Sequence, residues 1–189
     1  MRIITGKFRG RTLETIRGLT VRPATERVKG TIFNVLQNRI GLQDAVVLDL
    51  FAGSGSLGFE ALSRGARQVV FVDDSGRVLD VIDSNAERLG CADDCILIQS
   101  DAISFIERTN DRFDLVFADP PYAYKEVVQL PKLILGRGLL KKGGFLIIEH
   151  AKQVTFDPDG VMRIAVQKEF GNTRVSFFTS LEGSQEIGQ

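Results

Sequence analysis

The sequence is poor in the side chains from which metal centres and disulfide scaffolds are built. Its 189 residues include two cysteines and one histidine. A structural zinc site takes four ligands, mostly cysteine or histidine, and disulfide-built domains carry far more cysteine. Cys91 and Cys95 lie close together in the chain, but His150 is remote from both. We therefore expect no metal site and no disulfide framework.

Long apolar stretches are also missing. The longest run without a charged residue is Leu50–Phe59, ten residues, whereas a membrane-spanning helix needs about 20. The N-terminus, MRIITGKFRGRT, is basic but lacks the apolar stretch of a secretory signal peptide. A composition of 43% hydrophobic and 25% charged residues is typical of a globular protein. We expect a cytoplasmic protein with no membrane partner.

Charge is distributed unevenly along a chain whose net charge is zero. Residues 1–39 hold nine cations and two anions, so residues 40–189 carry the compensating negative charge. A basic segment attached to an acidic body is typical of proteins that bind a polyanion. A solvated basic face would give the same count, so charge alone leaves both interpretations open.

From residue 40 onward, short apolar runs alternate with helical patterns. We predict strands at 45–50, 68–72, 95–99, 113–118 and 145–149, and helices at 56–64, 77–89, 102–108 and 127–135. Apolar strands separated by helices indicate a parallel sheet that is covered on both faces. Alternating segments at 162–170 and 174–179, joined by Gly171-Asn172, predict an antiparallel hairpin at the sheet edge. The expected fold is α/β, with a mostly parallel seven-stranded sheet.

The N-terminal part is expected to form a small basic extension. Residues 1–22 alternate, which favours a hairpin or extended arm with Lys7, Arg9 and Arg11 on one face. A helix is predicted from Glu26 to about Arg39. The chain is therefore divided into a basic arm and helix (1–39), an α/β core (40–182) and a disordered tail (183–189).

A glycine-rich loop predicts a nucleotide-like ligand at the end of the first strand. Gly53-Ser54-Gly55-Ser56-Leu57-Gly58 fits the pattern G-x-G-x-x-G, follows a predicted strand and opens a predicted helix. Asp73 lies 20 residues after Gly53, at the end of the second strand. A carboxylate at that position can hold both hydroxyls of a ribose.

Asp49, four residues before Gly53, helps to choose the ligand. A pyrophosphate favours helix N–H groups and no adjacent anion, whereas a ligand with an ammonium group suits a nearby carboxylate. S-adenosylmethionine (SAM) carries an amine, a carboxylate, a sulfonium and a ribose. SAM is therefore favoured as the cofactor. A capping role for Asp49, and a nicotinamide-dependent oxidoreductase that uses the same loop, stay open as alternatives.

The tetrad Asp119-Pro120-Pro121-Tyr122 follows the fourth predicted strand directly. Ligands of open α/β sheets lie beyond the carboxyl ends of the strands, so the tetrad is expected beside the glycine loop. The Asp119 carboxylate and the Pro120 carbonyl can each accept an N–H from an exocyclic amine on a base. Tyr122 can stack on that base. This chemistry predicts methyl transfer to an amine without a metal.

Together these motifs resemble a known family. DLFAGSGSLGFEALSRGA (49–66), FVDD (71–74), SDA (100–102) and DPPY (119–122) resemble the class I, Rossmann-like, SAM-dependent methyltransferases. MRIITGKFRGRTL, RPATERVKGTIFNVL and the ending FGNTRVSFF are similar to the bacterial small-subunit rRNA guanine-N2 methyltransferase family. The resemblance covers residues 1–180.

The resemblance implies methyl transfer from SAM to the N2 amine of one guanine in 16S rRNA, within an assembled or assembling small subunit, by a monomer that releases S-adenosylhomocysteine. Asp119 to Tyr122 would hold the guanine. The implied cofactor-binding residues are Asp49, Phe51, Gly53, Gly55, Asp73, Asp101 and Ala102. The candidate RNA contacts are Lys7, Arg9, Arg11, Arg22, Arg27 and Lys29.

Other activities stay open. An adenine-N6 or protein glutamine-N5 methyltransferase uses related tetrads, and a non-catalytic RNA-binding assembly factor could keep the fold. The basic arm favours RNA over the protein substrate, and the intact tetrad argues against loss of catalysis. His150, at the end of the fifth strand, is expected to have a surface or capping role, with a catalytic base as the alternative.

Overall fold

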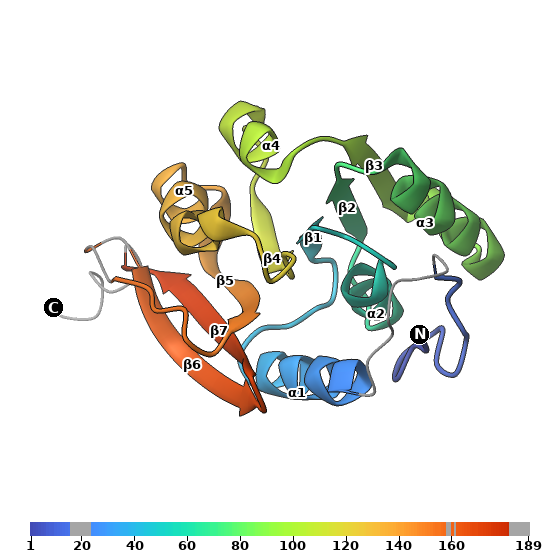
Figure 1. The fold of residues 1–189 in the computed structure, drawn as a ribbon. Coiled ribbons are helices and arrows are strands. Elements are labelled where there is room, and N and C mark those ends of the chain that lie inside the picture. Colours follow the sequence, from blue (N-terminus) through green and yellow to red (C-terminus); the bar gives the residue numbers. More distant parts are fainter. Residues whose placement is uncertain (16–23, 158–159, 161, 182–189) are drawn as a thin grey trace, which may run out of the picture.

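The computed structural model describes residues 1–15, 24–157, 160 and 162–181. Seven strands form one sheet in the order β3-β2-β1-β4-β5-β7-β6 (Figure 1). The strands are β1 (Val46–Leu50), β2 (Gln68–Asp73), β3 (Cys95–Gln99), β4 (Phe113–Ala118), β5 (Leu140–Ala151), β6 (Met162–Phe170) and β7 (Thr173–Ser180). The first five are mutually parallel, and β7 pairs antiparallel with both β5 and β6. The predicted sheet and its C-terminal hairpin are confirmed.

Helices cover both faces of the sheet. They are α1 (Ala24–Gln37), α2 (Ser56–Ser63), α3 (Gly76–Leu89), α4 (Ala102–Arg108) and α5 (Leu130–Gly136), with short 3-10 helices η1 (Ala92–Asp94) and η2 (Lys125–Gln129). Alternation along β1 and β4 sends Val47 and Phe117 into a core with α1, α2 and α3. The intervening Leu48 and Val116 enter a second core with α4 and α5. None of the helices in this described part is long and apolar enough to cross a membrane.

Two predicted elements differ in detail. The helix predicted at 127–135 is divided into η2 and α5, because Pro131 favours a new helical start within the first turn of α5. β5 begins five residues before the predicted strand, so Gly143-Gly144, expected to form the turn before that strand, lies within β5, at an irregularity in its pairing with β4. A Cβ at Gly144 would lie 2.7 Å from the Asp114 carbonyl oxygen, which explains the glycine by close strand approach.

The expected N-terminal hairpin is present only as two short ends, Met1–Ile3 and Arg11–Leu13, which are joined antiparallel without regular strands. One isolated bridge pairs Arg2 with Thr12, and residues 5–10 between them form turns. The prediction that Lys7, Arg9 and Arg11 share one strand face is therefore wrong, because their backbone N–H groups bond to α2 or close these local turns. Arg22 and the predicted tail at 183–189 lie outside the described residues.

Candidate active site

One cleft of about 630 Å³ opens at the carboxyl ends of β1, β2, β4 and β5. The strand order runs from β1 through β2 to β3 on one side and from β4 to β5 on the other, so it changes direction between β1 and β4. Open α/β sheets bind ligands at such a switch point. The glycine loop and the tetrad therefore meet in one cavity, as predicted from their places after strands. The predicted site residues that line it are Asp49, Phe51, Gly53, Asp73, Asp101, Ala102, Lys29 and the tetrad Asp119 to Tyr122.

The glycine loop is shaped by backbone that only glycine adopts easily. Gly53 and Gly55 have φ of 53° and 69°, in the left-handed region. A Cβ at Gly58 would lie 2.3 Å from the Phe71 ring, so the third glycine permits close packing of α2 on β2. Phe51 also has a positive φ of 59°, an uncommon backbone state for an aromatic residue, at the cleft wall.

Asp49 is a buried carboxylate at the base of the cleft. It is 2% exposed, and its Oδ2 accepts the Gly58 N–H at 2.9 Å. Burial raises its pKa to about 8, and the negative charges of Asp119 and Asp73 act in the same direction. The Gly58 hydrogen bond opposes that rise without cancelling it. With that pKa the carboxyl is largely protonated near neutral pH, and a cationic ligand beside it, such as the amine of SAM, would favour its ionised form.

Asp73 holds the glycine loop as well as facing the cleft. Its Oδ2 accepts the Gly53 N–H and its Oδ1 accepts the Ser75 N–H, both at 3.1 Å. Burial raises its pKa, while those two hydrogen bonds lower it. Asp101 caps α4 by accepting the Ser104 N–H at 2.9 Å. These contacts fix carboxylates along one wall, where the ribose and adenine of SAM would fit.

The tetrad presents an aromatic face beside a carboxylate. Asp119 is exposed and Pro120 is buried. Tyr122 is 53% exposed, yet its hydroxyl lies 2.5 Å from the Thr173 hydroxyl at the start of β7. A hydrogen bond at the ring's far end restricts its rotation while leaving much of its surface accessible. This arrangement can stack on a planar base and accept its N–H groups.

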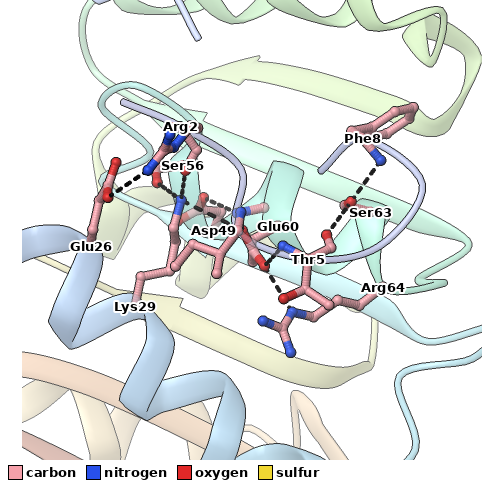
Figure 2. Close-up of polar contacts among 12 residues, drawn as sticks. Arg2, Thr5, Phe8, Glu26, Lys29, Asp49, Ser56, Glu60, Ser63 and Arg64 are labelled. Atoms are coloured by element: carbon pink, nitrogen blue, oxygen red, sulfur yellow. Dashed lines mark hydrogen bonds and ion pairs between the residues drawn. The ribbon is translucent and has the colours of Figure 1, made fainter. Parts of the chain in front are cut away.

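Lys29 was expected to contact RNA, and this prediction is wrong. Its side chain is 1% exposed. Its Nζ donates to the Arg2 carbonyl at 2.7 Å and to Ser56 Oγ at 2.9 Å, and it lies 3.6 Å from Glu60 Oε2 (Figure 2). Position 29 shares the buried face of α1 with Phe33, one turn later. Lys29 therefore joins α1 and the N-terminal segment to α2, beside the cleft.

The fully buried Glu60 side chain binds the N-terminal segment to α2. Its carboxylate accepts the N–H groups of Ile4 at 2.7 Å and Thr5 at 3.0 Å, and pairs with Arg64 at 2.9 Å (Figure 2). Next to it, Ser63 Oγ accepts the Phe8 N–H at 2.9 Å. The contacts join residues 4–8 to residues 60–64, which are 55 or 56 positions apart in the sequence, so no local pattern could have revealed the cluster.

The other candidate RNA contacts in the described residues are exposed side chains. Lys7 lies 3.6 Å from Asp94, and Arg11 donates to the Arg88 carbonyl at 2.6 Å. Arg9 lies in the turn between them, and Arg27 lies on the first turns of α1. These four side chains stand outside the cleft lining, where they could meet a phosphate backbone but not the cofactor.

Among the cleft residues that the sequence analysis did not single out are the polar or aromatic side chains of Ser56, Tyr124 and Glu149. Ser56 begins α2 and bonds Lys29, Tyr124 packs edge-on against Phe51 with ring centroids 4.9 Å apart, and Glu149 comes from β5. Register along β4 and β5 could have revealed Glu149, because it follows Ile148, the partner of Ala118 just before the tetrad. Ser56 and Tyr124 lie within or next to the predicted motifs but gave no separate signal.

The expectation for His150 is wrong. The side chain is 3% exposed, with Nε2 2.8 Å from Ser176 Oγ and Nδ1 2.9 Å from the Ala151 carbonyl oxygen. Its ring packs edge-on against Phe156, in the core on the α4 and α5 face. Burial lowers its pKa. His150 is a buried core residue and does not line the cleft.

Metal ligands are not gathered anywhere in the described chain: no group of three or more histidine, cysteine or acidic side chains there is arranged to hold an ion. Cys91 and Cys95 are both free thiols, and Cys95 Sγ donates to the Cys91 carbonyl at 3.2 Å.

The sequence of this chain is similar to a protein-family model and to named methyltransferases. The family model described as "Conserved hypothetical protein 95" matches residues 1–179. The ribosomal RNA small subunit methyltransferase D of Haemophilus influenzae is 36% identical over 155 residues, covering 80% of this chain and 79% of its own. Its namesake in Escherichia coli is 35% identical, with coverages of 79% and 74%.

Solved structures share the fold over nearly the whole chain. Escherichia coli yhhF superposes with a TM-score of 0.84 at 30% identity and covers 95% of this chain and 97% of its own. Haemophilus influenzae HI0767 gives 0.80 at 32% identity, with coverages of 96% and 98%. The sheet is thus of the Rossmann-like methyltransferase type. The chain belongs to the family of Conserved hypothetical protein 95, together with the ribosomal RNA small subunit methyltransferases D.

Proposed function

We propose that the protein transfers a methyl group from SAM to the exocyclic N2 amine of a guanine in 16S rRNA of the small ribosomal subunit. The observation that carries this proposal is the meeting of the glycine loop, Asp73 and the Asp119-Pro120-Pro121-Tyr122 tetrad in one cleft. The named relatives are small-subunit rRNA methyltransferases, which supports RNA as the substrate. The exposed basic residues of the N-terminal segment fit a phosphate backbone.

The residues present fit SAM. Asp49 is buried with a raised pKa, so an ammonium beside it would relieve an unfavourable charge. Asp73 would hold the ribose hydroxyls, and Asp101 with Ala102 would meet the adenine. When bound, SAM supplies a methyl group made electrophilic by its sulfonium; the amine gains that methyl and releases one proton, and SAM leaves as S-adenosylhomocysteine.

The tetrad would prepare the amine. The lone pair of an exocyclic amine is delocalised into the base, so it needs orientation before it can react. Asp119 accepts one N–H and the Pro120 carbonyl accepts the other, which directs the lone pair toward the cofactor side of the cleft. Tyr122, tethered by Thr173, stacks on the base. Asp119 also stabilises the positive charge that develops on nitrogen.

The test uses SAM labelled in its methyl group. The protein is offered unmodified small subunits, naked 16S rRNA, DNA and protein, and the digested products are identified. We expect label in N2-methylguanosine with the wild-type chain and none with Asp119→Asn, whose cofactor binding is measured separately by titration. Label in methyladenosine or methylglutamine would refute the proposed substrate. Binding of SAM with no label in any product would refute the proposed activity.

A further inference from the structure

A second carboxylate lies beside Asp119 in the cleft. β4 and β5 run parallel, and their register pairs Ala118 with Ile148. Asp119 directly follows the end of β4 and Glu149 is the next residue on β5, and neighbouring strands are about 4.8 Å apart. Both residues line the cleft. Glu149 therefore stands next to the first residue of the tetrad.

Glu149 and Asp119 lie on the same face of the sheet. Two residues before Glu149 on β5, Ile147 enters the core under α1 and α2, so strand alternation places Glu149 on that face too. Phe117 enters the same core from β4, and Asp119, just beyond the end of that strand, lines the same cleft as Glu149. On its other side, Glu149 pairs with the buried Val175 of β7. Glu149 is half-buried, bounded by strands on both sides, with the cleft in front of it.

Two adjacent carboxylates accept hydrogen bonds and donate none when ionised. The Watson–Crick edge of guanine places two donors side by side, the N1–H and the N2 amine. Adenine offers its N6 amine beside the lone pair of N1, which a carboxylate repels. A primary amide offers a single amine. Guanine is therefore the base whose edge matches this pair of acceptors.

We propose that Glu149 accepts the N1–H of the target guanine while Asp119 accepts an N2–H, which makes Glu149 the residue that selects guanine over other amine-bearing bases. This inference rests on the proposed function and deepens it. The charge of the cleft agrees with entry of an uncharged base: among the described residues, its lining includes six acidic side chains and one lysine. A phosphate would be repelled there, so the base would enter by turning out of its stack.

The experiment compares two bases at the target position of the RNA, once the wild-type product has located it. One RNA carries guanine, and the other carries 2-aminopurine, which keeps the C2 amine but has a lone pair at N1. The wild-type protein is expected to favour guanine by about 10- to 100-fold in kcat/KM, as for a base read by paired hydrogen bonds. Glu149→Gln, whose amide can donate to N1, is expected to shift that ratio toward 2-aminopurine by at least tenfold.

Controls separate recognition from folding. Glu107→Gln changes an exposed acid on α4 outside the cleft and is expected to leave the ratio unchanged. Glu149→Asp keeps a carboxylate and is expected to keep the guanine preference at a lower rate. SAM affinity, measured by titration, should stay within about twofold in all three variants.

Each outcome decides the inference. A wild-type protein that methylates 2-aminopurine as well as guanine would overturn it without any variant, as would an unchanged ratio in folded Glu149→Gln. A wild-type protein that forms no N2-methylguanosine would instead remove the proposed function. If Glu149→Gln fails to fold, the wild-type preference and Glu149→Asp still decide, because loss of guanine preference in Glu149→Asp contradicts the role.

Discussion

Replacing Lys29 by methionine should destabilise the protein rather than simply weaken its hold on RNA. Methionine keeps the length of the aliphatic stem, so packing along α1 is largely preserved. What is lost is the ammonium, which bonds the Arg2 carbonyl and Ser56 Oγ and faces Glu60 in a site that is 1% exposed. The variant therefore tests the buried cluster directly.

The magnitude follows from what remains around Glu60. Removing one partner of a buried ion pair costs about 3–5 kcal/mol, because the other charge stays buried. Here Glu60 keeps Arg64 and the N–H groups of Ile4 and Thr5, so we expect the lower end, about 3 kcal/mol. For a domain of this size that loss lowers Tm by about 6–12 °C. Salt should change the loss little, since a buried pair is poorly screened.

The assay is urea unfolding and thermal melting of the wild type, Lys29→Met and Lys7→Met. Lys7 is the matched control, because it also faces an acid at 3.6 Å but is half-exposed, and exposed pairs contribute about 0–1 kcal/mol. The structural role would be refuted by two results together. Lys29→Met would melt within about 2 °C of Lys7→Met, and it would bind rRNA with a shallower salt dependence than the wild type. Those results would restore Lys29 as an RNA contact.

Further predictions concern the cleft and the N-terminal segment. Asp119→Asn should lower kcat by at least about 10³-fold while SAM affinity, measured by titration, changes little. Burial raises the pKa of Asp49 from 3.8 to about 8, so the folded chain holds that proton more tightly than the unfolded chain does. The contribution of Asp49 to stability should therefore fall between about pH 4 and pH 8. The unfolding free energy of Asp49→Asn should lack this fall, and the same pH slope in the variant and the wild type would contradict the prediction. Arg9→Glu should weaken rRNA binding and reduce its salt slope, measured by titration at several salt concentrations, whereas Arg163→Glu on β6 should not. Gly6→Ala should release the N-terminal segment to limited proteolysis, because its Cβ would meet a backbone carbonyl of α2 at 1.7 Å and its φ is +89°; unchanged protection would show that this contact is dispensable.

The central strands of the sheet could be predicted because most of their residues are buried on both faces. The apolar run 113–118 indicates such a covered strand, and the structure begins and ends it at the predicted residues. The edge strand β3 also has its predicted bounds, 95–99, although none of its residues is buried. Glycines were harder to interpret. The pair Gly143-Gly144 fits a turn equally well, and only the structure shows that Gly144 lies against the Asp114 carbonyl, at an irregularity in the pairing of β4 with β5.

The cleft was predictable where motif and topology coincide. The loop at 53–58 and the tetrad at 119–122 each follow a strand, and in a parallel sheet the carboxyl ends of strands meet at one edge. The prediction for Lys29 is wrong because the charge of a lysine does not by itself place the side chain in solvent. Its position, one turn before Phe33 on the buried face of α1, was a stronger indication than its charge. The partner that permits this burial, Glu60, lies 31 residues away on another helix.

Burial of Lys29 reduces the number of cations near the N-terminus that can contact a phosphate. Its charge was counted with those of Lys7 and Arg9, but it is balanced by Glu60 and cannot reach a phosphate. The cations that remain exposed there lie outside the cleft lining, while the cleft itself is lined mainly by carboxylates among its charged side chains. An RNA backbone would thus be attracted outside the cleft and repelled from within it. An uncharged base that offers N–H donors would satisfy both conditions, which supports the proposed substrate.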